Sequence, residues 1–242
     1  RQMCIRDSIG IFACYCEKFL TKIIPGILRT VLVGAGTMIL TYIAGVVVLG
    51  PLGDLVGGIV VKFFLWASAT FGPVAIALLA SAMPWLVMTG MHHAVTPFMV
   101  QAFADPGYDV FFRPSYILHN MAEGGACLGV ALRTKNPEFR AECLSLAFGC
   151  IVAGVTEPAL YGVNLPLKRP MLGIMAGTAV GGIIAGVLGA TAYVYGYSTI
   201  LALPIFQQTM WAMAIAIVAA IVVSALVTAA LGFEDRPVKA QK

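Results

Sequence analysis

The sequence predicts an all-α polytopic membrane protein, and three observations support this prediction. Of its 242 residues, 60% are hydrophobic and only 11% are charged, and the mean hydropathy is +0.93. A soluble domain carries about 25% charged residues, so this chain has too little polar surface to face water all round. The 26 glycines suit membrane helices, whose backbones approach closely where small residues meet. We therefore take the lipid bilayer as the solvent for most of the chain.

Apolar segments of spanning length follow one another along the chain. They are residues 30–50, 171–191 and 210–231, and about 20 apolar residues suffice to cross the hydrocarbon core as a helix. Residues 63–91 are also free of charge, but Pro73 and Pro84 interrupt them. Because proline breaks or kinks a helix, this stretch predicts one helix followed by the start of a second element.

Domain boundaries follow from these segments. We expect residues 30–232 to form one membrane domain, preceded by an amphipathic lead-in over residues 9–29. Residues 233–242 form a tail that we expect to be cytoplasmic, and from Glu234 on it is polar and expected to be disordered. Residues 1–8 have neither the apolar core nor the cleavage site of a signal peptide, and we expect a truncated or non-native end there.

Short clusters of basic residues set the expected topology. The net charge is +4, and the clusters lie between apolar stretches, at Lys18/Lys22/Arg29, Arg133/Lys135/Arg140, Lys168/Arg169 and Arg236/Lys239/Lys242. Cytoplasmic loops of membrane proteins carry such clusters, whereas loop 192–209 has no Lys or Arg. Residues 141–167 should then leave and return to one face as a re-entrant hairpin. Irregular backbone at membrane depth is stable only in protein or along a wet cavity, so this hairpin should line the solute path.

Composition also limits the partners and cofactors that we expect. A nucleic-acid surface would interleave its basic residues with exposed aromatics, so we expect no nucleic-acid partner. The six cysteines form no CxxC pair, and no His/Cys cluster has zinc spacing. We therefore expect no metal and no cofactor, and interpret the cysteines as small buried apolar residues. The three tryptophans, Trp66, Trp85 and Trp211, are interpreted as interface or packing aromatics.

A carboxylate in a proline-broken apolar segment is the strongest functional signal. Glu157 lies in GVTEPALYGVNLPLK, residues 154–168. A carboxylate costs roughly 3 kcal/mol at the centre of a spanning helix, and Pro158 breaks the helix and leaves backbone carbonyls without donors. Together they offer acceptors to a hydroxyl-rich ligand. The alternative is a carboxylate that only pairs with an arginine or caps a helix.

A tandem histidine follows another apolar run, in TGMHH at residues 89–93. At membrane depth a histidine can donate to a ligand oxygen or accept a proton. Adjacent side chains point in different directions on a helix or strand, so we expect only one of His92 and His93 to face the ligand. The alternatives are a hydrogen-bonded core histidine and a metal ligand, although no third ligand has matching spacing.

Three further polar residues are candidates for binding the ligand. Asn120 and Glu123 are three residues apart and share a helix face, so they could line the same cavity. Polar contacts between helices are the alternative. Asn164, in the Glu157 stretch, is the third candidate.

These motifs resemble those of a known family. GVTEPALYGVNLPLKRP resembles the glutamate signature of enzyme IIC in the glucose superfamily of the bacterial sugar phosphotransferase system. Its YGVNLPLK portion looks most like the β-glucoside branch, with sucrose and trehalose permeases close by. TGMHH resembles the histidine motif of that superfamily, and EKFLTKIIPGILRTVLV and VVLGPLGD resemble the segment entering its transport domain. The resemblance extends from about residue 17 to residue 232.

The resemblance implies a homodimeric multi-pass carrier of the bacterial cytoplasmic (inner) membrane. This chain corresponds to the part that carries the re-entrant hairpins and the sugar, and the dimer contact is expected in an absent N-terminal half. Glu157 and one of His92 and His93 would bind the sugar near the hydroxyl to be phosphorylated. Neither the phosphocysteine motif of a IIB domain nor a IIA histidine site is recognisable. His119 and Glu123 stand where the family leads us to expect more neutral residues.

The expected function is sugar import coupled to phosphorylation, with a β-glucoside as the expected sugar. The sugar would move inward and receive a phosphoryl group from a separate phosphorylated IIB, and this would make the chain the membrane subunit of a phosphotransferase. Glu157 would accept a hydrogen bond from a sugar hydroxyl, and a histidine would orient or deprotonate the attacking hydroxyl. The alternatives are an ion-coupled secondary sugar transporter, with Glu157 and a histidine relaying protons, and a membrane sugar sensor.

Overall fold

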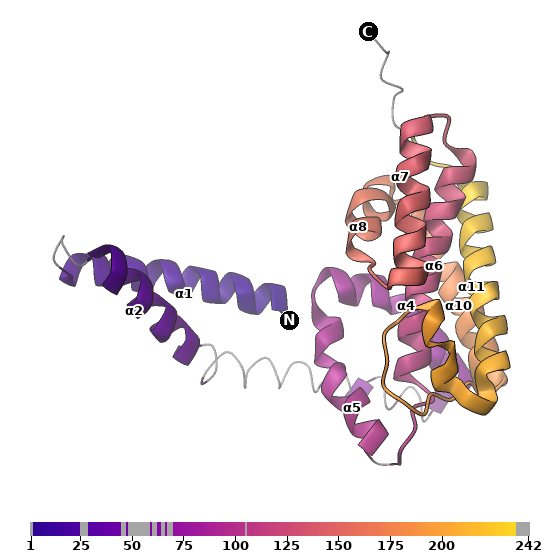
Figure 1. Cartoon of the computed structure of the whole chain (residues 1–242), viewed down its shortest axis with the longest axis horizontal. Coiled ribbons are helices and arrows are strands. Elements are labelled where there is room, and N and C mark those ends of the chain that lie inside the picture. The colour runs from indigo at the N-terminus through magenta and orange to yellow at the C-terminus, as the bar shows by residue number, and fades with distance from the viewer. Residues whose placement is uncertain are drawn as a thin grey trace, which may run out of the picture. The chain divides into compact units, whose positions relative to one another are not determined.

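The structure is a computed structural model that describes residues 2–24, 29–44, 47, 59, 62–63, 66, 70–104 and 106–235. These residues form helices joined by turns (Figure 1), and the only extended pairing among them is an isolated antiparallel bridge between Asp109 and Ala192. The all-α prediction is confirmed. The chain divides into two compact units, Arg1–Phe63 with Leu86–Thr96 and Phe64–Trp85 with Pro97–Lys242.

The first unit contains α1 (Gln2–Ile23), α2 (Arg29–Ala44) and the short helix η2 (Met91–Ala94). α1 and α2 lie side by side, and a β-carbon on Gly36 would lie 3.0 Å from Leu20 Cδ1. α1 runs without a break across the boundary expected after residue 8. The span expected over 30–50 is described as helix only to Ala44.

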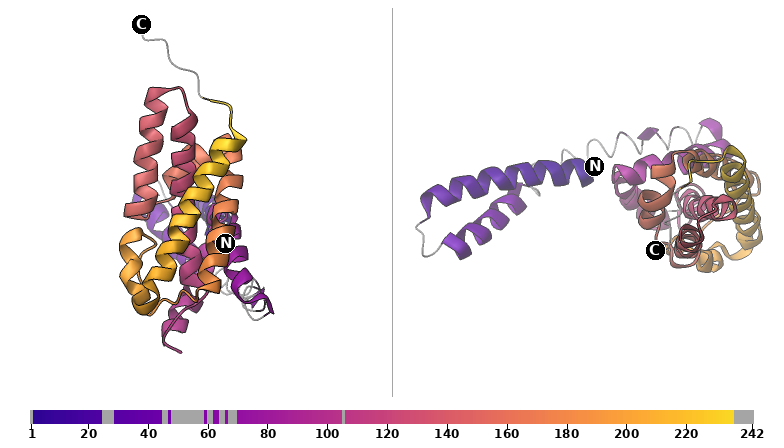
Figure 2. Two further views of the ribbon diagram at one scale, coloured as in Figure 1. Left: turned by 90° about the vertical axis from the view of Figure 1, so that its right-hand side faces the viewer. Right: turned by 90° about the horizontal axis from the view of Figure 1, so that it is seen from above.

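Four helices form the body of the second unit. They are α6 (Phe112–Arg133), α7 (Pro137–Phe148), α10 (Arg169–Val187) and α11 (Met210–Leu231). α6, α10 and α11 contact one another, and α7 returns along α6; Figure 2 shows them side by side from two directions. α4 (Pro73–Met88), with Pro84 inside it, lies against α10, because Ser81 Oγ donates to Met175 O at 3.2 Å. α5 (Thr96–Ala104) follows η2.

Glycines set how closely these helices approach. A β-carbon on Gly177 of α10 would lie 2.5 Å from Ala220 O of α11, and one on Gly125 of α6 would lie 2.6 Å from Ile221 O. The α10 glycines that meet α11 recur at every fourth residue, as Gly173, Gly177 and Gly181. Such backbone contact gives van der Waals attraction where lipid provides no hydrophobic drive between helices.

Two of the described helices are long and apolar enough to cross a membrane. They are α10, and α11 together with the 3₁₀ helix η5 (Ile200–Thr209) before it. α4 and the following residues Met91–Ala104, bent by 120°, give a third candidate if they count as one span. The spans predicted at 171–191 and 210–231 are confirmed. The loop predicted at 192–209 is instead helical from Ile200, because its apolar second half folds into 3₁₀ turns, a common connector between helices.

Residues 137–167 fold into a hairpin. α7 leads into a π-helical turn, η3 (Gly149–Ala153), and the chain returns through α8 (Glu157–Ala159), a second π turn η4 (Leu160–Asn164) and α9 (Leu165–Leu167). Arg133, before the hairpin, donates to Ala229 O, and Arg169, after it, donates to Leu231 O; both acceptors lie in the last turn of α11. The hairpin therefore begins and ends at one end of the unit, as predicted; its depth in a membrane stays a prediction.

The beginning of the C-terminal tail is fixed to the helix bundle. Asp235 accepts hydrogen bonds from Thr134 Oγ1 at 2.6 Å and from Lys135 N at 2.7 Å. The expectation of disorder from Glu234 onward is therefore wrong at Asp235, because its carboxylate accepts hydrogen bonds from donors that lie just before α7. Residues 236–242 lie outside the described part of the chain.

Candidate functional site

Glu157 lies at the start of the returning arm of the hairpin. It is the first residue of α8, directly before Pro158, and the π turns η3 and η4 lie on either side of it in the sequence. Its side chain is exposed, and no described residue forms a hydrogen bond or ion pair with its carboxylate. The arginine-paired alternative is thus not observed among the described residues. Glu157 is open to accept hydrogen bonds from a ligand.

The turn between the two arms depends on Gly154. Its φ of 76° is a left-handed backbone conformation, which glycine adopts without steric cost. The turn also lies close to the loop before η5, since a β-carbon on Gly154 would lie 2.7 Å from Thr199 Cγ2. The backbone around Glu157 is therefore fixed by a residue that cannot be enlarged without moving that loop.

Asn120 anchors this turn to α6. Its Nδ2 donates to Gly154 O at 3.3 Å and to Ser198 O at 2.8 Å. The residue is buried, with 7% of its surface exposed. These bonds are the interhelical contacts that the sequence left open as the alternative to ligand binding.

Glu123 lies one turn further along α6 and is fully buried. Its Oε1 is 3.7 Å from His119 Nε2, and neither carboxylate oxygen accepts a hydrogen bond from a described residue. A buried carboxylate is costly unless a partner stabilises it, and His119 is the side chain placed to do so. The two unexpected polar residues of α6 thus form a pair.

Asn164 ends the second π turn and is also buried. Its Oδ1 accepts from Cys127 Sγ of α6 at 3.7 Å, and its Nδ2 has no hydrogen-bond partner among the described residues. Asn120, Glu123 and Asn164 therefore all lie where α6 meets the hairpin. Of the candidates in this unit, Glu157 is the one with an exposed side chain.

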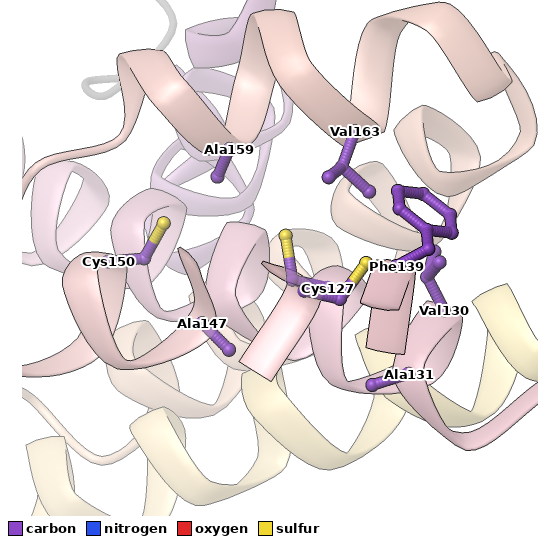
Figure 3. Close-up of a cluster of buried hydrophobic side chains, with 9 residues drawn as sticks. Cys127, Val130, Ala131, Phe139, Ala147, Cys150, Ala159 and Val163 are labelled. Carbon is purple, nitrogen blue, oxygen red and sulfur yellow. The ribbon is translucent and has the colours of Figure 1, made fainter. Parts of the chain in front are cut away.

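An apolar cluster holds the returning arm against α6 and α7. Its buried members are Cys127, Val130, Ala131, Phe139, Cys143, Ala147, Cys150, Ala159 and Val163. Figure 3 shows Ala159 and Val163 reaching from the returning arm towards the side chains of α6 and α7. Cysteines are thus buried apolar residues here, as predicted, and Cys16 is buried too. Cys14 is exposed, against the prediction, and the side chain of Cys4 lies outside the described residues.

His92 and His93 belong to the first unit, in η2. Their rings lie against each other, with centroids 4.0 Å apart, whereas we expected them to point in different directions. His92 Nδ1 lies 3.5 Å from Leu86 O, and His93 is exposed. Whether either histidine shares a site with Glu157 stays a prediction.

A polar network at the start of α6 was not predicted as part of the site. Asp109 accepts from the backbone N–H groups of Phe111, Phe112 and Arg113, at 2.8, 2.9 and 2.6 Å. Arg113 Nη2 in turn donates to Ser198 Oγ at 3.1 Å, the residue whose carbonyl Asn120 binds. An aspartate just before a helical run is a recognisable capping signal, but the partner at Ser198 is too far along the sequence to infer.

Comparisons with known proteins identify the family of this chain. The chain matches the family model described as "Phosphotransferase system, EIIC" over residues 8–178. It is 32% identical over 231 residues to the PTS system arbutin-, cellobiose-, and salicin-specific EIIBC component of Escherichia coli K12, covering 93% of this chain and 47% of the relative. It is 33% identical over 228 residues to the PTS system beta-glucoside-specific EIIBCA component of Bacillus subtilis 168, covering 93% and 37%.

A trehalose-specific EIIBC component of Escherichia coli K12 is 30% identical over 224 residues, covering 90% of this chain and 47% of the relative. The chain thus spans less than half the length of these relatives. No solved structure matches it. The residues matched by the family model include both the histidine pair and the Glu157 hairpin, and the chain belongs to the EIIC family of the phosphotransferase system.

Proposed function

We propose that this chain binds a β-glucoside and carries it across the bacterial inner membrane for phosphorylation by a phosphorylated IIB domain. Two relatives that support this proposal are named for β-glucosides or for arbutin, cellobiose and salicin, and their names join EIIB to EIIC. The chain itself would bind and present the sugar, and IIB would supply the phosphoryl group. Pairing of two copies through a part of the protein outside this chain belongs to the same proposal.

The observation that carries the proposal is the open carboxylate of Glu157. It is exposed, it stands at a helix start beside Pro158, and no described side chain or backbone group bonds to it. A carboxylate accepts hydrogen bonds from hydroxyl groups, and bonds to a charged acceptor contribute about 1.5–3 kcal/mol each. Glu157 is therefore suited to hold a sugar hydroxyl while its neighbour on the ring is left for phosphorylation.

Sugar binding would also be governed by the residues behind Glu157. Asn120 fixes the Gly154 turn, and the apolar cluster holds the returning arm. A shift of the turn or of the arm would therefore move Glu157. In this proposal Asn120, Glu123 and Asn164 act behind the binding surface. One of His92 and His93 would orient or deprotonate the attacking hydroxyl, a role worth about 10²–10⁴-fold in rate for a general base.

Replacement of Glu157 in the intact phosphotransferase system tests the proposal. Glu157→Ala should abolish salicin binding, and Glu157→Gln should raise the Kd about 10- to 100-fold, because the amide accepts more weakly. Glu138→Gln is the matched control, since Glu138 is an exposed carboxylate in the first turn of α7. Titration calorimetry and salicin phosphorylation are the measurements.

Three results would overturn parts of this proposal. An unchanged salicin affinity in Glu157→Ala would remove Glu157 from the site. Uptake that follows a proton gradient without a phosphoryl donor would make the protein an ion-coupled transporter. Phosphorylation of sucrose or trehalose, but not salicin, would contradict the β-glucoside assignment while leaving the EIIC function.

A further inference from the structure

A basic cavity and an apolar groove adjoin at the end of the second unit where the hairpin begins. The cavity, of about 490 Å³, is lined at its polar side by Arg133, Thr134, Lys135 and Arg140. The groove, of about 560 Å³, runs between α6, α7 and α11 and is lined almost wholly by apolar side chains. Arg140 and Leu144 line both hollows, so the two form one amphiphilic surface.

The three cations of the cavity have no carboxylate partner among the described residues. Within the described ranges, Arg133 and Arg140 donate to backbone carbonyls alone: Arg133 Nη1 donates to Ala229 O, and Arg140 Nε donates to Ala131 O at 2.9 Å. The Lys135 side chain makes no hydrogen bond or ion pair within the described part of the chain. Asp235 is close by, but both of its oxygens already accept hydrogen bonds, from Thr134 and from Lys135 N. The cavity therefore presents three cations to an anion: two arginines that backbone carbonyls hold in place, and a lysine that can turn towards it.

The groove beside it suits a hydrocarbon chain. Leu132 and Leu226 on its walls are 71% and 62% exposed, and Val222 and Leu144 are each 47% exposed. These side chains lie on helices of a membrane protein, so acyl chains are their natural neighbours. An anionic headgroup in the basic cavity would direct one such chain into the groove.

From this continuity of charge and apolar surface, we infer a binding site for an anionic phospholipid, with its phosphate in the Arg133–Lys135–Arg140 cavity and an acyl chain in the groove. Basic pockets between membrane helices on the cytoplasmic side bind anionic headgroups, and this end carries the basic clusters of a cytoplasmic face. The site lies where the hairpin leaves the bundle, so a bound lipid would bridge α6, α7 and α11. This inference does not depend on which sugar the protein carries.

Native mass spectrometry of the purified chain, with phosphatidylglycerol and phosphatidylcholine added in equal amounts, tests the site. Phosphatidylglycerol should be retained preferentially. Lys135→Gln, which removes no observed side-chain bond, and Arg133→Gln should each weaken that retention about fivefold, the effect of one basic residue at an anionic surface. Arg169→Gln is the matched control, because Arg169 also donates to the last turn of α11 but lines neither hollow.

A second variant separates the lipid from a free anion. Leu226→Gln should weaken phosphatidylglycerol retention and leave the binding of inorganic phosphate unchanged. Equal retention of the two lipids, or an equal loss in Arg169→Gln, would overturn the inference in favour of diffuse charge. Displacement of phosphatidylglycerol by equimolar inorganic phosphate would reduce the site to a phosphate site, and displacement by an isolated IIB domain would make it a protein-docking surface; either result contradicts the lipid site.

Discussion

The α10–α11 pair and the α7–α8 hairpin occupy the same unit but are held together in opposite ways. Between α10 and α11 the contact is backbone on backbone, at glycines that recur every fourth residue. Between the hairpin and α6 the contact includes buried polar groups: Asn120 on Gly154, and Cys127 on Asn164. α10 is one regular helix, whereas the hairpin contains two π turns and a left-handed glycine.

α6 separates these two regions and has a different face for each. Gly125 and Gly129 meet α11 so closely that a β-carbon on either would lie within 2.6 Å of a backbone oxygen. Asn120, Glu123 and Cys127 lie on the side that meets the hairpin. The difference suggests a division of labour, with a rigid glycine-packed scaffold behind a polar, irregular segment that presents Glu157. π turns occur often at functional sites, and here they lie on the hairpin alone among the described elements of the second unit.

The largest expected effect is on the polar side of α6. His119→Leu should lower the free energy of unfolding by about 3–5 kcal/mol, because it leaves Glu123 buried without its neighbour. The double replacement His119→Leu with Glu123→Met should recover most of that loss, since an apolar pair needs no partner. Denaturant unfolding in detergent micelles is the measurement. If the double variant is no more stable than His119→Leu alone, the pair is not coupled.

On the glycine-packed side, Gly177→Ala should destabilise the unit by about 1–3 kcal/mol, the usual cost of overpacking. The added β-carbon would lie 2.5 Å from Ala220 O, and a backbone oxygen cannot move aside without shifting α11. Gly162→Ala is the control, because its β-carbon would meet nothing nearer than 3.9 Å. Equal stability of the two variants would show that close helix approach does not hold this pair.

Hydropathy predicts the scaffold well and the hairpin only in outline. Spans 171–191 and 210–231 are visible in the sequence because a helix in lipid needs a long apolar run. The hairpin can be predicted from the distribution of charge, since basic residues precede and follow it. The pairing of His119 with Glu123 follows from their spacing of four residues, once both are known to be buried.

Other features of the site could not be inferred from sequence. Asn120 binds Ser198, and Arg113 binds the same residue, across 78 and 85 positions of the chain; no local pattern encodes such a contact. The burial of Asn164 depends on how the returning arm packs on α6. The left-handed turn at Gly154 is compatible with the sequence, but many glycines here serve helix packing instead, so glycine alone does not identify a turn.

A smaller effect is expected where the hairpin is tied to α6. Asn120→Ala should cost about 1–3 kcal/mol of unfolding free energy, because the carbonyls of Gly154 and Ser198 lose their donor. Ser198→Ala is the control, since it removes the hydroxyl that Arg113 binds but keeps the carbonyl. Sugar affinity measured alongside distinguishes the roles: a weakened affinity in a variant of unchanged stability would make Asn120 a sugar ligand and not an anchor.

The smallest expected effect has the opposite sign and lies within the hairpin itself. Gly149 has helical dihedral angles, φ −55° and ψ −45°, and a β-carbon there would meet only Val155 O, at 3.9 Å. Gly149→Ala should therefore stabilise the protein by about 0.4–1 kcal/mol, because alanine restricts the unfolded chain and fits the folded one.

Gly154, five residues later, is the matched position at which we expect the stability change to have the opposite sign. Its left-handed φ disfavours any side chain, and the added carbon would meet Thr199 Cγ2 at 2.7 Å, so Gly154→Ala should destabilise. The sign of the difference separates two views of the hairpin. If both variants destabilise, the π turn at Gly149 needs glycine's freedom and the whole hairpin is under backbone constraint. If Gly149→Ala stabilises and leaves salicin affinity unchanged, the constraint is confined to the Gly154 turn, directly before Glu157.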